Sequence, residues 1–218
     1  SATDGLITIK IEDNTGVILE INSETDFVAK NQYFQEFCEN TSTLCVKNKI
    51  QNIDDLFESS FINSDNNVKV ELTNLISKLG ENIVIGQFSI FSTEGAFANY
   101  DHSNGKIGVI VEFTNSVDDT TGRDIAMQVA AMNPPYVSSD QVPTEDLENE
   151  SDILRKQALS EGKPEQVVDK IIQGRLSKFY KENCLVEQTF VKDPEKSIKD
   201  LLPGETSVKS FNRISLVG

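Results

Sequence analysis

Apolar positions change their spacing abruptly near residue 25. Residues 17–21 are apolar at most positions and mainly β-branched, which is typical of a strand, and from Phe27 onward the apolar positions follow helical spacing. The change falls at Thr25 and Asp26, whose side chains are good caps for the free N–H groups of a helix. The pattern therefore predicts a strand, a short join and then a helix over about residues 26–46.

The same order of elements occurs again later in the chain. Turns rich in Asn and Gly precede two similar apolar blocks, residues 16–20 and residues 108–112, which start 92 residues apart. Such turns favour β-hairpins. A helix is predicted after the second block as well, over about residues 120–132. The repeated order indicates two related subdomains.

Each hairpin needs a third strand, because an isolated hairpin is only marginally stable. Residues 83–91 and 210–217 have the pattern of half-buried strands and can supply them, and residues 68–79 carry one apolar helical face. We therefore expect an α+β fold with two subdomains, residues 1–94 and residues 95–218. Each would contain a small three-stranded antiparallel sheet with helices.

Residues 144–187 differ from the rest of the second subdomain. Thr144 is expected to cap a helix that ends near residues 161–162, and Pro164 is expected at the first position of a second helix. Two helices joined by so short a connection run antiparallel. The hairpin either folds across the body or projects as a coiled coil, and its charged outer faces favour projection.

Composition excludes several classes of partner. The net charge is −15 over 218 residues, whereas direct binding of nucleic acid needs clustered Lys and Arg, which the sequence lacks. No apolar run approaches the ~20 residues of a membrane span, and the first five residues do not resemble a signal peptide. The three cysteines lack zinc-site spacing and are odd in number, which favours a reducing compartment.

The only histidine does not come with catalytic partners. His102 follows Asp101 on a predicted strand, where adjacent side chains point to opposite faces. The sequence contains neither a nucleophile-elbow pattern nor a phosphate-binding glycine-rich loop. We therefore expect a protein that is not an enzyme and holds no metal.

The join near residue 25 resembles the signature of elongation factor Ts, the nucleotide exchange factor of bacterial and organellar translation. The resemblance runs from Glu20 to Lys30, and later blocks follow in the family's order: residues 124–132, 161–164, 170–176 and 187–193. On local spacing alone, Thr25 or Asp26 would be an ordinary cap and Phe27 a residue packed back onto the sheet. The length of the resemblance favours a functional interpretation.

The resemblance implies a guanine nucleotide exchange factor that binds elongation factor Tu and promotes GDP release. It implies no cofactor, because such a factor acts on the Mg-GDP held by its partner. Asp26 and Phe27 are implied to contact the partner and drive exchange. Asp26 could bond groups of the partner near its metal site or simply fix the loop. We assign Asn22 and Thr25 to shaping the loop, with Thr25 as the helix cap. Gln128 stands where many family members carry a contacting His, and a packing role is an equally good interpretation for it.

Two departures from the family leave an alternative open. The family normally carries a small helical module before the first hairpin and often a helix after the last strand, and we expect this chain to represent the core alone. The alternative is a binding or stabilising subunit that docks on the same partner without releasing nucleotide. The expected location is the bacterial cytoplasm, or the matrix or stroma of an organelle. Projecting hairpins could also pair two copies into a homodimer.

Overall fold

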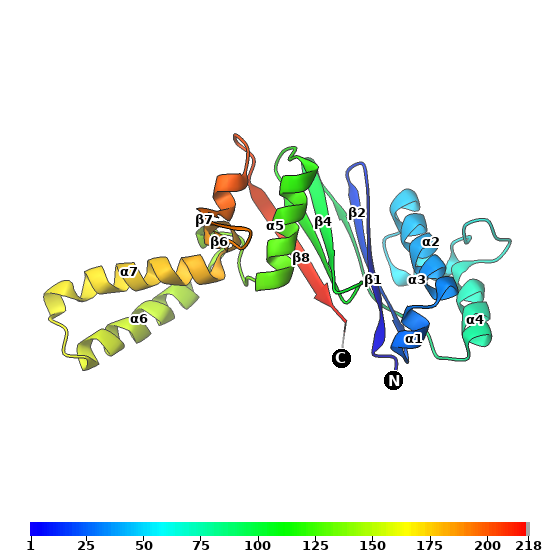
Figure 1. Ribbon diagram of the computed structural model, residues 1–218, viewed down its shortest axis with the longest axis horizontal. Helices are drawn as coiled ribbons and strands as arrows, with labels where there is room; N and C mark the ends of the chain where they lie inside the picture. The colour runs from blue at the N-terminus through cyan, green and yellow to red at the C-terminus, as the bar shows by residue number, and fades with distance from the viewer. Residues whose placement is uncertain (217–218) are drawn as a thin grey trace.

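Two three-stranded antiparallel sheets lie face to face at the centre of the computed structural model, which describes residues 1–216 (Figure 1). The first sheet has the order β1 (Asp4–Glu12), β2 (Thr15–Ser23), β3 (Val84–Ser92). The second has the order β4 (Ala96–His102), β5 (Ile107–Phe113), β8 (Val208–Ser215). The expected α+β fold with two small sheets is confirmed. The domain boundary at residue 94 stays a prediction.

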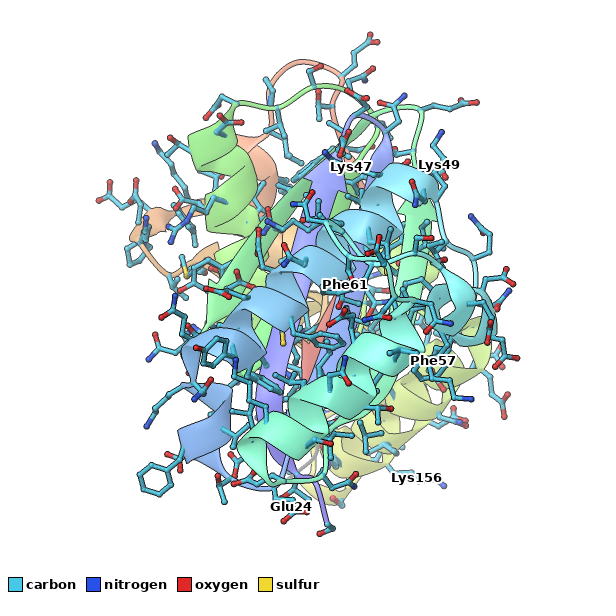
Figure 2. All side chains as sticks on the ribbon, turned by 90° about the vertical axis from the view of Figure 1, so that its right-hand side faces the viewer. Glu24, Lys47, Lys49, Phe57, Phe61 and Lys156 are labelled. Atoms are coloured by element: carbon cyan, nitrogen blue, oxygen red, sulfur yellow. The ribbon has the colours of Figure 1, made fainter. Side chains whose placement is uncertain are left out.

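Helices cover the outer face of the first sheet. They are α1 (Asp26–Ala29), α2 (Gln32–Asn48), α3 (Ile53–Glu58) and α4 (Val68–Leu79). Figure 2 looks onto this face and shows Phe61 between α2 and α4, where its ring stacks on Phe37 with the ring centres 5.5 Å apart. Val17, Leu19 and Ile21 of β2 pack into the same apolar core.

A single helix, α5 (Asp119–Met132), covers the outer face of the second sheet (Figure 1). Val109 and Val111 of β5 share its apolar core with Ile125 and Val129 of the helix. Strand β8 returns from far along the chain to pair with β5, with Ile214 opposite Gly108. The strand predicted over residues 210–217 is confirmed as far as Ser215, and Val217 lies outside the described residues.

The inner faces of the two sheets meet through isoleucines. These are Ile7, Ile9, Ile18, Ile110 and Ile214. The glycine at the head of each repeated block makes room for them. A Cβ atom on Gly108 would lie 2.6 Å from Cγ2 of Ile7, and one on Gly16 would overlap the side chain of Ile110. The repeat in the sequence therefore reflects close packing of one sheet on the other.

An antiparallel helical hairpin projects from the second sheet's side of the molecule (Figure 1). It consists of α6 (Thr144–Ser160) and α7 (Glu165–Asn183), and its narrow seam is formed by Leu154, Ala158, Val168 and Ile172. The projection confirms the expected hairpin. Short elements lie at or near its base: η1 (Ser139–Gln141), η2 (Leu185–Glu187), β6 (Thr189–Phe190), β7 (Asp193–Ser197) and η3 (Ile198–Leu201).

The helix predicted over residues 26–46 is interrupted, and that prediction was wrong. Helix α1 ends at Ala29 and α2 begins at Gln32. Asn31 between them has extended backbone, and its side-chain oxygen accepts a hydrogen bond from the N–H of Tyr33 at 2.8 Å. Because a cap satisfies one of the free N–H groups of a new helix, Asn31 starts α2 separately.

The two helices of this projecting hairpin, called the arm below, each begin one residue away from the predicted position: α6 begins one residue earlier and α7 one residue later. Thr144 is the first residue of α6 rather than its cap, and Pro143 occupies the cap position without a side-chain hydrogen bond. Pro164 occupies the cap position of α7, which begins at Glu165. Both prolines have extended backbone, and this conformation leads the chain into a helix without supplying a cap.

In the part of the chain from residue 1 to residue 216, none of the helices combines the length and the apolar character that a bilayer span requires. No cluster of three or more His, Cys, Asp or Glu side chains with metal-binding geometry occurs over the same range.

Substituting Gly108 by Ala should destabilise the protein by about 1–3 kcal/mol, because the added methyl group overpacks the space between the sheets. Its backbone φ lies outside the left-handed region, so no backbone strain contributes. The control is Gly174→Ala in α7, where a Cβ would meet no other atom within 4 Å. Because Ala has the higher helix propensity, this change should stabilise the protein by about 1 kcal/mol. Thermal unfolding followed by circular dichroism measures both, and equal effects of the two changes would contradict this account.

Candidate functional site

Phe27 presents most of its ring to solvent. It lies in the first turn of α1, and 82% of its surface is accessible, more than for any other large apolar residue in the described part of the chain. The next two residues, Val28 and Ala29, are buried. Folding alone does not explain an apolar ring in this position, because burial would be favourable by about 1.5–3 kcal/mol. The ring is therefore available to contact another molecule.

Thr25 caps the helix that carries this ring. Its backbone is extended, and its hydroxyl oxygen accepts a hydrogen bond from the N–H of Val28 at 3.4 Å. The predicted cap is confirmed. Ser23 reinforces the turn, because its hydroxyl donates to the carbonyl oxygen of Thr25 at 2.9 Å.

Asp26 is the first residue of α1 and lies beside Phe27. Its carboxylate forms an ion pair with Lys30 at 3.0 Å, one helical turn later. The hydrogen bond and the positive charge of Lys30 hold the pKa of Asp26 below its ordinary value, so the carboxyl group is ionised at neutral pH. Both side chains line a cleft of about 560 Å³, whose other walls include Leu6 and Lys106.

Asn22 holds the end of the strand that leads into the turn. Its amide donates to the carbonyl oxygen of Asp4 at 3.3 Å and to Oε1 of Glu20 at 3.2 Å. The side chain is buried, and it connects β2 to the start of β1. Asn22 therefore ties the last residues of β2 to β1, and its role in shaping the loop stays a prediction.

Glu81 is a further residue of this site that the sequence pattern did not indicate. It follows α4, yet its carboxylate accepts hydrogen bonds from the N–H of Thr25 at 3.1 Å and from the hydroxyl of Thr25 at 2.6 Å. A third bond comes from the N–H of Glu24 at 3.2 Å. Glu81 lies more than fifty positions away in the chain, and no periodic pattern connects the two segments.

Most residues of this site lie within the part of the chain that matches a known protein family. Residues 24–217 match the family model described as Elongation factor TS. The chain belongs to the elongation factor Ts family. It is therefore related to translation elongation factors that in general interact with elongation factor Tu. Thr25, Asp26, Phe27 and Gln128 lie inside the matched range, and Asn22 lies just before it.

Gln128, the remaining family position expected in the site, lies far from Phe27. It belongs to α5, on the outer side of the second sheet, whereas α1 lies on the outer side of the first (Figure 1). Gln128 has no exposed surface. Its amide donates to the carbonyl oxygen of Thr189 at 3.0 Å and to Oε1 of Gln188 at 3.3 Å, and its Oε1 accepts from the N–H of Val191 at 3.0 Å.

These bonds make Gln128 part of the base of the arm. Gln188 in turn donates to the carbonyl oxygen of Glu182 near the end of α7 at 3.1 Å. The two amides thus connect α5 to the segment that follows the arm. In this conformation the polar atoms of Gln128 serve the interior of the protein, and a direct contact with a partner stays a prediction.

Replacing Gln128 by Ala should destabilise the fold by about 1–3 kcal/mol, because the N–H of Val191 and the carbonyl of Thr189 lose their buried partner. Gln173→Ala is the matched control, since Gln173 is exposed in α7. Urea unfolding should show a lower midpoint for the first variant only. An unchanged midpoint would mean that the amide network does not contribute to stability.

Proposed function

We propose that this chain is a guanine nucleotide exchange factor that binds elongation factor Tu and promotes the release of GDP. The observation that carries the proposal is the exposed ring of Phe27, with 82% of its surface accessible on a helix capped by Thr25. Membership of the elongation factor Ts family supports the identity of the partner.

Exchange of this kind is a coupling between two binding events. The factor weakens GDP by the same free energy by which GDP weakens the factor. An acceleration of about 10⁴-fold would require about 5.5 kcal/mol of differential binding. Burial of Phe27 in a pocket of the partner contributes about 1.5–3 kcal/mol, so the ring acts together with other contacts.

Asp26 is the nearest source of a further contact. Its ionised carboxylate is exposed and pairs with the exposed ammonium group of Lys30, and such surface ion pairs are weak. The carboxylate can therefore exchange Lys30 for hydrogen-bond donors of the partner. Phe27 and Asp26 would together displace elements of the partner that support the Mg²⁺ coordination shell.

The proposed reaction makes and breaks no covalent bond. The chain consequently acts as a binding protein, requires no cofactor of its own, and would work wherever its partner elongates proteins, in a bacterial cytoplasm or in an organelle. The nucleotide and its Mg²⁺ belong to the partner.

Stopped-flow release of fluorescent GDP from elongation factor Tu tests the proposal. Increasing amounts of the chain should accelerate release to a plateau, and Phe27→Ala should lower that plateau by about tenfold, equivalent to about 1.4 kcal/mol, because the ring no longer enters the partner. Ile153→Ala is the control, because Ile153 is an exposed apolar residue on the projecting helical hairpin, away from α1. It should leave the plateau unchanged.

Docking measured in the same samples separates the two functions considered for this chain. Binding to elongation factor Tu without faster GDP release would contradict exchange and favour a stabilising subunit. Equal losses of docking and of release in Phe27→Ala would make the ring an ordinary anchor instead of the residue that drives exchange.

A further inference from the structure

We propose that Glu81 is a positioning residue for exchange: its carboxylate holds the turn that presents Phe27 to the partner. The inference rests on the proposed exchange function and adds a residue from a separate part of the chain to it.

Three donors of one turn converge on this carboxylate. Oε2 of Glu81 accepts from the N–H groups of Glu24 and Thr25, at 3.2 and 3.1 Å, and Oε1 accepts from the hydroxyl of Thr25 at 2.6 Å. An ionised carboxylate is purely an acceptor with room for several bonds, and hydrogen bonds to it are stronger than those between neutral groups. Both oxygens are thus used on the same two residues.

The turn needs such an acceptor because it lies between two regular elements. Strand β2 ends at Ser23 and α1 begins at Asp26. The N–H groups of Glu24 and Thr25 therefore fall outside both the ladder of the sheet and the internal bonds of the helix. The carboxylate of Glu81 supplies the hydrogen-bond acceptor for these two N–H groups, which neither the sheet nor the helix provides.

The chain is constrained on both sides of Glu81. Gly80 ends α4 in the left-handed conformation, with φ 74°, and Ile83 two residues later is buried. Glu24 also reaches back, because its Oε1 accepts from the N–H of Asn82 at 3.0 Å. Figure 2 shows Glu24 at the end of the helical face of the first sheet. Residues 24–25 and residues 81–82 thus hold each other through hydrogen bonds in both directions, an arrangement called the clamp below.

The clamp matters for exchange because it determines the direction of the Phe27 ring before the partner arrives. Thr25, the residue held by Glu81 through two bonds, also caps the helix that contains Phe27. A ring presented on a fixed turn avoids the entropy of ordering that turn when the ring inserts, and this lowers the free-energy cost of the insertion step in the bound complex.

A double-mutant cycle distinguishes positioning from general stabilisation. GDP release from elongation factor Tu is measured at saturating amounts of the wild-type chain, Glu81→Ala and Glu81→Gln, each with Phe27 intact and with Phe27→Ala. With Phe27 present, Glu81→Ala should lower the rate about tenfold, and Glu81→Gln should lower it less, because the amide keeps one acceptor oxygen. In the Phe27→Ala background the same changes should alter the rate less than about twofold, since coupled residues are non-additive.

The control variant is Glu94→Gln, an exposed glutamate in the connection between β3 and β4. It should not change the rate in either background. Hydrogen exchange in the free chain provides a readout that does not depend on the partner: the amide protons of Glu24 and Thr25 should lose protection in Glu81→Ala, while those of β5 keep theirs.

The outcomes separate this inference from the proposed function. If the wild-type chain does not accelerate GDP release, the proposed function fails and the inference fails with it. If the wild-type chain is active and depends on Phe27, but Glu81→Ala lowers the rate equally in both backgrounds, only the positioning role is overturned. Unchanged protection of Glu24 and Thr25 in that variant would also overturn it.

Discussion

Burial of β2 on both faces is the constraint on which the rest of the structure depends. All nine residues of this strand are buried. Leu19 and its alternate neighbours pack under the helices, while Ile18 points into the core between the sheets. A shift of register by one residue would move each of these side chains to the wrong face. The end of β2 at Ser23 is therefore fixed in space, and so is the start of the turn that follows it.

The exposed ring of Phe27 has its meaning in this setting. A mobile loop could expose an apolar side chain without consequence, but here the turn is bounded by a buried strand on one side and by the buried residues Val28 and Ala29 on the other. Glu81 holds the turn through hydrogen bonds from a separate segment, and Asn22 ties the end of β2 to β1. The fold thus holds in place an apolar ring that does not pack into the core of the free protein. This contrast between a rigid support and an unburied ring is what suits the site to binding a protein partner.

Much of this arrangement could be predicted from the sequence because it depends on local pattern. The repeated glycine blocks at residues 16 and 108 indicated two related units, and the capping side chain of Thr25 marked the start of a helix. Contacts between distant segments left no such pattern. Glu81 lies on a separate connection from the turn it holds, and the buried partners of Gln128 follow about sixty residues later. The break at Asn31 was missed because one polar residue within an amphipathic stretch acts as a cap only in three dimensions.

The most direct test of the central claim is to observe the ring of Phe27 as the partner binds. A single 4-fluorophenylalanine at position 27 gives a ¹⁹F resonance whose solvent isotope shift reports contact with water. In the free chain the resonance should show a full isotope shift, as expected for a ring with 82% of its surface accessible. On saturation with elongation factor Tu the isotope shift should be lost and the line should broaden, because the ring enters a pocket. A resonance that keeps its isotope shift in the saturated complex would contradict the account.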